Sequence, residues 1–509
     1  MLQASPELTG ARVEERSIAV RHYGLFIGGD WTKPGQGAEF DAINPFTGEA
    51  WASLREASPD EVGDAVAAAA AAQPGWAATN GATRAQILNR IADVITAHAD
   101  DMAVFESTDN GKVIRETSSQ MLFAARLFRF YAGYADKLFG STIPLDNPTI
   151  FDYTTREPYG VVGLITAWNS PITLLCNKLP AALAAGNTVV VKPSEHASVS
   201  TLEFCNLLVE AGLPAGVVNV VTGGAETGTA LVRHPAIAKV SFTGSPGVGR
   251  KIAGMAGELL KPVTLELGGK SPNIIFDDAD AEAATIGALA GIFGATGQTC
   301  VAGSRLFVQR GLYQDIVDRL ATRAKAIRLG DPLDPKSEMG TVANQPQFDR
   351  IMQSIETAKS DGARLVAGGG RATGEGLGKG LFVQPTIFAD ARNDMAVAQT
   401  EIFGPVLTII PFETEEEAVT MANDIPFGLA SGIWTKDISR AMRLIPQMKS
   451  GVVWVNTYRM VAAQAPFGGT KESGFGRERG EAGIAEFTTT RNVMIDYSSE
   501  ARDPFAIKN

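Results

Sequence analysis

Cysteine and histidine are both scarce in this chain of 509 residues, which has three cysteines and four histidines. Three cysteines cannot form a disulfide framework, and an odd number is typical of a reducing compartment. The histidines stand far apart and lack the spacing of metal ligands, so we expect no metal site. They are His22, His98, His196 and His234.

An excess of basic residues and long apolar runs are missing as well. Lys and Arg number 45 against 56 Asp and Glu, a net charge of −11 that argues against nucleic acid and anionic membrane surfaces as partners. No apolar run approaches the ~18 residues that cross a bilayer, and the first twenty residues lack the apolar core of a signal peptide. We therefore predict a cytoplasmic protein with a loose tail over residues 1–20.

Apolar strands that alternate with helix-length segments are the main architectural signal. Between Val161 and Phe276 the strands read VVGLITAW, TVVVKP, VVNVVTG, KVSFTG, VTLELGG and NIIF. Such a series predicts a parallel sheet covered on both faces. A second series after Ser304 predicts a second α/β unit, and the strand-like VMIDYS near the C-terminus lies outside both. Before the sheets, a capping box at Ser58 and Glu61 predicts a helix start, and further helices are expected over about 83–107 and 116–137.

Polar residues and glycines follow successive strands of the first series. Open parallel sheets bind ligands beyond the carboxyl ends of their strands. Lys192 and Glu195 suit ribose hydroxyls, and Gly244 with Ser245, at the start of a helix, suits a pyrophosphate. A solvated surface ion pair is the plainer alternative for Lys192 and Glu195, but the recurrence of such residues at strand ends favours a cofactor site.

Cys300 stands among small residues in FGATGQTCVAG, whereas Cys176 and Cys205 lie in apolar helical segments typical of packing. A nucleophilic thiol needs access to substrate and a neighbouring base or a lowered pKa. A structural free thiol is the alternative. The surroundings of Cys300 favour the reactive interpretation.

Eight motifs in matching order resemble the aldehyde dehydrogenase superfamily, of the hydrolytic and non-acylating type, from about Leu25 to about Tyr497. They are TAWNSP (166–171), VVVKPSE (189–195), FTGSPGVGR (242–250), LELGGKSPNIIF (265–276), GQTC (297–300), EIFGPV (401–406), NDIPFGLASGIW (423–434) and PFGGTKESGFGRERG (466–480). The resemblance implies an α/β fold with a Rossmann-type cofactor domain, a second α/β catalytic domain and a small β oligomerisation extension. The implied ranges are 21–141 and 160–277 for the cofactor domain, 278–486 for the catalytic domain, and 142–159 with 487–509 for the extension.

The resemblance also implies the catalytic residues. Cys300 would attack the aldehyde and form first a thiohemiacetal and then a thioester. The side-chain amide of Asn169 and the N–H of Cys300 would hold the oxyanion, and Glu266 would activate the hydrolytic water. Lys178 matches a lysine sometimes assigned to proton transfer, with a helix-surface lysine as the alternative.

NAD is the cofactor that the resemblance implies. Glu195 favours NAD because its carboxylate would repel a 2′-phosphate, although NADP use stays possible. Lys192 and Glu195 would bind the adenosine ribose, Ser245 the pyrophosphate, and Glu401 with Phe403 the nicotinamide ribose. The expected contacts are Thr166, Ala167, Trp168, Lys192, Ser194, Glu195, Gly224, Gly228, Phe242, Gly244, Ser245, Val248, Leu267, Glu401 and Phe403.

The substrate positions depart from many members that oxidise small aliphatic aldehydes. Ser170, Asn177 and Val461 stand where those members have aromatic residues, which predicts a wider, more polar tunnel and a bulky or oxygen- or nitrogen-bearing aldehyde. Arg459 offers an alternative, a semialdehyde acid, against the plainer interpretation of a solvated loop arginine. The expected substrate contacts are Ser170, Asn177, Thr299, Val301, Arg459, Val461 and Phe467.

Two other functions are compatible with parts of this sequence. A CoA-acylating relative would use the same cysteine without a water-activating glutamate, so Glu266 favours hydrolysis. A non-catalytic structural paralogue would not need Cys300, Glu266 and Asn169 together. The implied extension would pair the strand near 151–157 with VMIDYS and form a homodimer or homotetramer.

Overall fold

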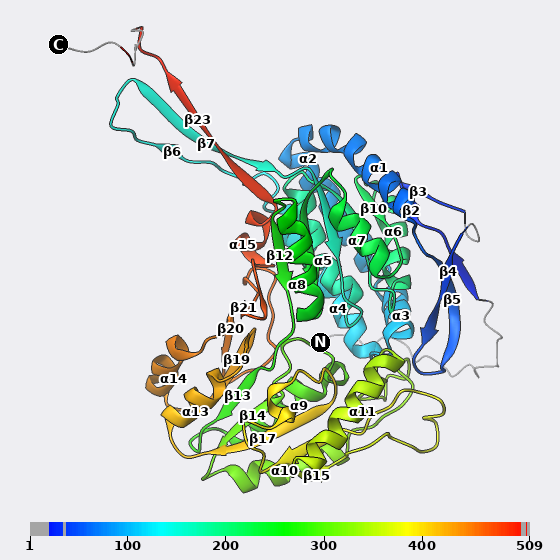
Figure 1. The fold of residues 1–509 in the computed structure, drawn as a ribbon, viewed down its shortest axis with the longest axis vertical. Helices are drawn as coiled ribbons and strands as arrows, with labels where there is room; N and C mark the ends of the chain where they lie inside the picture. Colours follow the sequence, from blue (N-terminus) through cyan, green and yellow to red (C-terminus); the bar gives the residue numbers. More distant parts are fainter. Residues whose placement is uncertain (1–19, 34–36, 500–504, 506–509) are drawn as a thin grey trace, which may run out of the picture.

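The structure is a computed structural model that describes residues 20–33, 37–499 and 505. Apart from Val20, the expected tail lies outside the described residues. Figure 1 shows two sheets with their helices, one above the other, and a long β arm that projects from the upper body toward the C-terminus. None of the described helices combines the length and the hydropathy that a bilayer-crossing segment needs.

The first sheet has five parallel strands flanked by short antiparallel ones, in the order β22-β12-β11-β8-β9-β10-β2-β3. Apolar β-branched residues fill its central strands, as expected for strands buried on both faces. The strands are β2 (Phe26–Ile27), β3 (Asp30–Trp31), β8 (Val161–Ile165), β9 (Thr188–Lys192), β10 (Val218–Val220), β11 (Ile237–Thr243), β12 (Val263–Glu266) and β22 (Gly474–Phe475).

Helices cover both faces of this sheet. On one face α1 (Pro59–Ala78), α7 (Ala225–Arg233) and α8 (Pro246–Glu258) contact the strands. On the other lie α5 (Pro171–Ala184) and α6 (Val199–Glu210), backed by α2 (Gly81–Ala97), α3 (Ala99–Asn110) and α4 (Ile114–Ala132). Alternation sorts the strand residues, since Val162 and Leu164 join the core beneath α5 while Val161 and Ile165 join the core beneath α1.

The sequence predicted the start of α1 correctly but not the interruption between α2 and α3. The capping box is confirmed at α1, where Ser58 Oγ accepts a hydrogen bond from Glu61 N, and Ser58 N donates to Glu61 Oε2. The single helix expected over about 83–107 is wrong, because the chain leaves helical geometry at His98, with φ −104° and ψ 16°, and forms α2 and α3.

The second sheet has the order β15-β16-β17-β14-β13-β19-β20 and is parallel except for β15. Two apolar cores cover its faces. Its strands are β13 (Pro272–Ile275), β14 (Arg305–Gln309), β15 (Arg364–Ala367), β16 (Thr386–Ala389), β17 (Val406–Phe412), β19 (Ala430–Trp434) and β20 (Val452–Val455). Its helices are α9 (Ala281–Phe293), η1 (Gly294–Gly297), α10 (Tyr313–Lys325), α11 (Gln345–Ser360), α12 (Ala396–Gln399), α13 (Glu415–Asn423), α14 (Ile438–Leu444) and η2 (Ile445–Gln447).

The chain changes sheets earlier than the expected boundary at 277. β12 ends at Glu266 in the first sheet, and β13 already pairs with β14 and β19 in the second. The strand NIIF therefore belongs to the second sheet. The short linker Leu267–Ser271 carries the chain from one sheet to the other, which an apolar pattern alone does not reveal.

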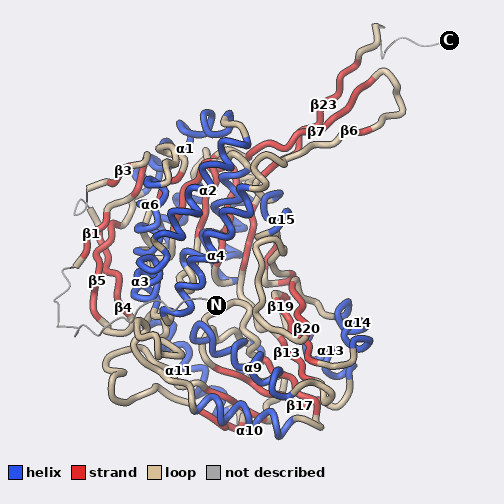
Figure 2. Tube along the Cα trace, turned by 180° about the vertical axis from the view of Figure 1, so that it is seen from behind, coloured by secondary structure: helices blue, strands red, loops and turns tan. Residues whose placement is uncertain are grey.

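The remaining strands form small sheets. In the arm, β23 (Thr488–Asp496) pairs antiparallel with β7 (Ile150–Pro158), and β7 pairs with β6 (Thr142–Ile143). Figure 2 shows this arm extending from the body beside α15 (Gly480–Ala485). The expected pairing of VMIDYS with the strand near 151–157 is therefore confirmed. β1 (Arg21–Tyr23), β4 (Glu39–Asn44) and β5 (Glu49–Arg55) form another sheet, and β18 (Phe427–Gly428) pairs with β21 (Thr470–Lys471).

Candidate active site

A pocket of about 460 Å³ lies between the two sheets. The carboxyl ends of β8, β9, β10, β11 and β12 supply one wall, and segments ahead of β14 and β17 supply the other. Its size is within the ~300–1,000 Å³ of small-molecule sites. All of the expected cofactor contacts line it, from Thr166 to Phe403, together with Asn169, Glu266 and Cys300. The described residues contain no group of three or more His, Cys, Asp or Glu side chains placed to hold a metal ion.

Lys192 and Glu195 stand at the end of β9. Lys192 is only 5% exposed, and its Nζ donates to Pro193 O at 3.1 Å and lies 3.4 Å from Glu195 Oε2. Burial lowers the pKa of Lys192. Burial alone would raise the pKa of Glu195, but the charge of Lys192 brings it below its usual value. A lysine this deeply buried is not part of a solvated turn.

The start of α8 faces the same pocket. Ser245 is the N-cap, and its Oγ accepts a hydrogen bond from Val248 N at 3.4 Å. Nearby, the buried hydroxyls of Thr166 and Thr243 have no hydrogen-bond partner among the described residues. N–H groups at a helix start attract anions, so this corner of the pocket offers both free N–H groups and free hydroxyls.

Glu401 and Phe403 approach from the opposite wall. Glu401 Oε1 accepts a hydrogen bond from Gly269 N at 2.9 Å, and burial raises the pKa of Glu401 to about 7. Gly268 packs so closely against this carboxylate that a Cβ there would collide with it. Phe403, in the left-handed region at φ +56°, meets the Trp168 ring edge-on with 5.3 Å between centroids.

Cys300 follows a left-handed turn, with φ of 53° at Ala295, 55° at Thr296 and 70° at Gly297. Both carboxylate oxygens of Glu116, from α4, accept a hydrogen bond from Ala295 N at 3.0 Å, which holds the first strained residue. The Cys300 side chain is partly exposed to the pocket. Burial, reinforced by the charges of Glu266 and Glu401, raises its pKa to about 12.

Asn169 and Glu266 line the same pocket as the Cys300 thiol. Asn169 Nδ2 donates to Gln298 O at 2.9 Å, which ties the amide to the Cys300 turn. Glu266 is 4% exposed, and neither carboxylate oxygen has a hydrogen-bond partner among the described residues. Burial, and then the charge of Glu478, raises the pKa of Glu266 well above its usual value. These three residues therefore bring a thiol, an amide donor and an unpaired carboxyl group to one cavity.

Lys178 does not line this pocket. Its side chain is fully buried, its Nζ lies 3.0 Å from Ser241 Oγ, and it forms an ion pair with Glu478. The alternative of a helix-surface lysine is therefore wrong, because α5 turns this face toward the segment that precedes α15. The charge of Lys178 still acts on Glu266, whose pKa it lowers against the larger raising effects of burial and Glu478.

A profile of the aldehyde dehydrogenase family matches residues 31–493. The chain belongs to the aldehyde dehydrogenase family. It is 44% identical to (Z)-2-((N-methylformamido)methylene)-5-hydroxybutyrolactone dehydrogenase of Acinetobacter baylyi, over 96% of this chain and 100% of the relative. It is 44% identical to betaine aldehyde dehydrogenase of Cereibacter sphaeroides, over 92% and 96%. The NAD+ complex of aldehyde dehydrogenase from Bacillus cereus has a TM-score of 0.92 and 41% identity, over 94% and 97%.

The expected substrate contacts of this aldehyde dehydrogenase are more dispersed than its cofactor contacts. None lines the main pocket. Ser170 Oγ accepts from the buried Lys112 Nζ at 2.7 Å. Thr299 borders a separate cavity of about 10 Å³, and Val301 is 6% exposed in a core of the second sheet. Val461 is exposed at the surface.

The side chains of three further substrate positions make specific contacts. Asn177 Oδ1 accepts from Arg479 Nε at 2.9 Å, and the Arg479 guanidinium lies over the ring of Phe467. Arg459 donates through one terminal nitrogen to Ala290 O at 2.9 Å. These roles in substrate binding stay predictions.

Several charged residues escaped the sequence reasoning. Glu116 holds the Cys300 turn, Glu478 pairs with Lys178, and Arg479 holds Asn177. Glu478 and Arg479 lie within the family motif PFGGTKESGFGRERG, and their adjacent charges are a signal visible in the sequence. Lys112 and Glu116, in NGKVIRE, carried no comparable signal.

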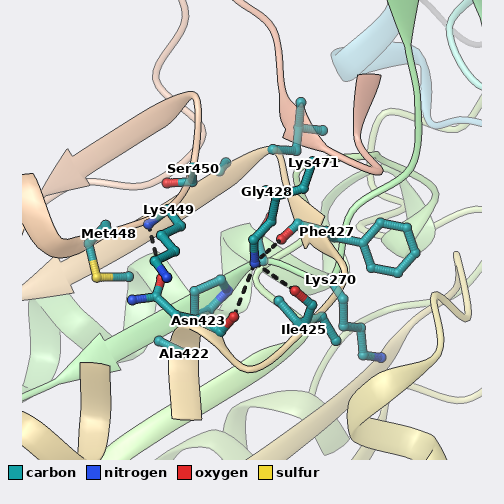
Figure 3. Close-up of a pocket in the computed structure, with 14 residues that line it drawn as sticks. Lys270, Ala422, Asn423, Ile425, Phe427, Gly428, Met448, Lys449, Ser450 and Lys471 are labelled. Atoms are coloured by element: carbon teal, nitrogen blue, oxygen red, sulfur yellow. Dashed lines mark hydrogen bonds between the residues drawn. The ribbon is translucent and has the colours of Figure 1, made fainter. Parts of the chain in front are cut away.

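A small cavity of about 10 Å³, room for one water molecule, lies beside Lys471. Figure 3 shows Lys471 Nζ donating to three backbone carbonyls, those of Asn423 (3.0 Å), Ile425 (2.6 Å) and Phe427 (3.3 Å), while Lys270 points away from it. The ammonium group is satisfied by these acceptors. It fastens the PFGGTKESG segment to the stretch from the end of α13 to β18, which gives Lys471 a structural role.

Proposed function

We propose that this protein oxidises an aldehyde to the carboxylic acid, with NAD as hydride acceptor and Cys300 as nucleophile. The observation that carries the proposal is the shared cavity, since Cys300, Asn169 and Glu266 line the same pocket as the expected NAD contacts. Membership of the aldehyde dehydrogenase family supports the reaction class.

The pocket suits a dinucleotide. Lys192 and Glu195 would hold the adenosine ribose, the start of α8 with the unpaired hydroxyls of Thr166 and Thr243 would hold the pyrophosphate, and Glu401 would hold the second ribose. NAD supplies the site, when bound, with an acceptor for the hydride. The NAD+ complex named for the Bacillus cereus neighbour supports this choice.

Cys300 begins as a thiol at neutral pH, because its pKa is raised to about 12. Attack by sulfur on the aldehyde carbon requires that this proton leave, and it places negative charge on the aldehyde oxygen. The Cys300 N–H makes no hydrogen bond to any described residue, and Asn169 spends only one amide hydrogen on Gln298. Both donors can therefore hold the oxyanion, and one such donor is worth about 10²–10³ in rate.

Glu266 would release the acid by activating water for attack on the Cys300 thioester. The pKa of Glu266 is raised toward neutral pH, and a general base is most effective when its pKa lies near the working pH. Its two unpaired oxygens can accept a hydrogen bond from water. This arrangement favours hydrolysis over acyl transfer to CoA.

The substrate we propose is a bulky or polar aldehyde. The Acinetobacter relative is named for a formamide-bearing hydroxybutyrolactone and the Cereibacter relative for betaine aldehyde, both larger and more polar than acetaldehyde. For the alternative semialdehyde acid, the hydrogen bond from Arg459 to Ala290 O gives that arginine a local structural role.

We also propose a homodimer or homotetramer joined through the arm. Within the described part of the chain β23 is an edge strand that pairs with β7 alone, and exposed Met494, Ile495 and Tyr497 lie along or beside it. Unpaired edges with apolar side chains favour pairing with another chain. Light scattering of the full chain, with a version lacking residues 488–509, would test the assembly.

The reaction itself is tested by NADH formation with a panel of aldehydes, with NAD affinity measured separately. Cys300→Ser should lower kcat by at least about 10⁴-fold and leave the Kd for NADH unchanged, because the hydroxyl is a poorer nucleophile of similar size. Cys205→Ala, at a buried position of α6, is the control. Near-normal turnover in Cys300→Ser would refute the nucleophile, and acyl-CoA as the main product in the presence of CoA would refute hydrolysis.

A further inference from the structure

Arg479 is a nearly buried guanidinium between two aromatic rings. It is 6% exposed, and its Cζ lies 4.9 Å from the centroid of Phe467 and 5.2 Å from that of Phe123. Its Nε donates to Asn177 Oδ1 at 2.9 Å. Residues from α4, α5 and the PFGG segment thus contact one positive charge. These segments are far apart in the sequence, so the sequence alone does not predict this cluster.

The two terminal nitrogens of Arg479 are free. Neither makes a hydrogen bond or an ion pair with any residue that the structure describes. Nor do they belong to the fully buried atoms that lack a partner, so both contact accessible space. Its neighbour Glu478 pairs with Lys178 instead. A buried guanidinium has five N–H donors, and leaving four of them without an acceptor in apolar surroundings is costly.

Arg479 lies within electrostatic reach of the expected catalytic residues. The charges of Cys300 and Glu266 both act on Arg479, and Arg479 in turn lowers the pKa of Cys300 against the larger raising effect of burial. Asn177 and Phe467, which it contacts, are both expected substrate contacts. The free donors therefore lie within electrostatic reach of the nucleophile and outside the cofactor pocket.

We propose that Arg479 determines substrate specificity by binding an oxygen acceptor, a carboxylate or a carbonyl group, on the substituent of the aldehyde. The inference rests on the proposed aldehyde oxidation. A guanidinium is planar and presents paired donors that match a planar oxygen group, and its contacts with the rings of Phe123 and Phe467 restrict its movement. The same charge repels a cationic substituent, so a quaternary ammonium aldehyde is a poor substrate. Arg479 touches the substituent and not the reacting carbon.

The test is kcat/KM for four aldehydes of similar length, namely succinic semialdehyde, its methyl ester, pentanal and betaine aldehyde. In the unaltered protein the two oxygen-bearing aldehydes should exceed pentanal, and betaine aldehyde should be the poorest. Arg479→Leu should lower kcat/KM for the oxygen-bearing aldehydes by about 10²-fold or more, since an unpaired polar site discriminates strongly, and should lower that for pentanal far less. A larger loss for the semialdehyde identifies a carboxylate, and equal losses for acid and ester identify a carbonyl oxygen.

Two further variants keep the inference falsifiable if Arg479→Leu folds poorly, which its Tm reports. Arg479→Lys keeps the charge without the planar fork, and it should keep part of the preference over pentanal. Arg459→Leu should keep all of it. Equal losses for all four aldehydes, or a preference that disappears in Arg459→Leu and survives in Arg479→Leu, would overturn the inference. Absence of NADH with every aldehyde in the unaltered protein would instead overturn the proposed function and the inference with it.

Discussion

The two parallel sheets share one architecture but turn opposite ends toward the pocket. The first sheet presents the carboxyl ends of its strands, where Asn169, Lys192 and Glu266 stand. The second presents the amino ends, since Cys300 precedes β14 while Glu401 and Phe403 precede β17. The linker after Glu266 is where the chain passes from one sheet to the other.

This difference suggests separate roles for the two sheets, cofactor binding for one and chemistry for the other. Carboxyl ends of parallel strands lead into helix starts, which suit phosphates and ribose hydroxyls. Amino ends are preceded by loops, and such a loop can hold a strained turn like the one ahead of Cys300. The first sheet is thus suited to hold the cofactor, and the loops of the second are suited to the chemistry.

Among the changes that compare the two sheets, the largest effect is expected at Glu266, where the chain leaves the first sheet. Glu266→Gln should lower steady-state kcat by about 10²–10⁴-fold, because an amide cannot take a proton from water. Attack by the Cys300 sulfur and formation of the first NADH should still take place. Rapid-quench measurements should therefore show close to one NADH per site, and mass spectrometry should show an acyl-enzyme. If neither the burst nor the acyl-enzyme forms, Glu266 acts before the thioester and the assignment to hydrolysis fails.

The sequence predicted the first sheet's side of the site better than the second's. The strand-end rule alone found Lys192, Glu195 and Ser245, because a parallel strand and the residue after it can be read from local pattern. Cys300 stood out by its small neighbours, but Glu401 and Phe403 came only from family motifs. No local rule points to loops ahead of strands.

Burial and long-range contacts were the other limit. The sequence leaves a surface position open for Lys178, whereas in the structure it pairs with Glu478, a residue 300 positions away in the chain. Arg479 passed unnoticed because its contacts come from three separated segments. Electrostatic partners of this kind depend on tertiary packing, and one sequence contains no local signal for them.

A smaller effect is expected at the carboxyl end of β9, away from the chemistry. Glu195→Gln should lower the ratio of kcat/KM for NAD over NADP by about tenfold, because it removes a negative charge beside the expected site of the 2′-phosphate. The kcat at saturating NAD should stay within about twofold, since this residue is remote from bond formation. Glu210→Gln, which removes an exposed glutamate elsewhere in the same region, should leave the ratio unchanged. A ratio unaltered in Glu195→Gln would contradict its place at the ribose.

The smallest effect is on protein stability, to which Glu266 and Glu195, at the same edge of the first sheet, should contribute with opposite sign. It is measured as Tm and does not require enzyme activity. The pKa of Glu266 is raised in the folded protein by burial, while a glutamate in the unfolded chain has a pKa of about 4.3. As pH rises above that value, the unfolded chain loses this proton while the folded protein retains it, so Glu266 makes the folded state less stable. Glutamine cannot ionise, so the Tm of Glu266→Gln should match the unaltered protein near pH 4.5 and exceed it by about 2–4 °C at pH 8.

The pKa of Glu195 is lowered, so its ion pair with Lys192 stabilises the folded state above the unfolded pKa, and Glu195→Gln should lower Tm at pH 8. Tm differences of the same sign in both variants at pH 8 would show that the two carboxyl groups do not differ in environment as their contacts indicate.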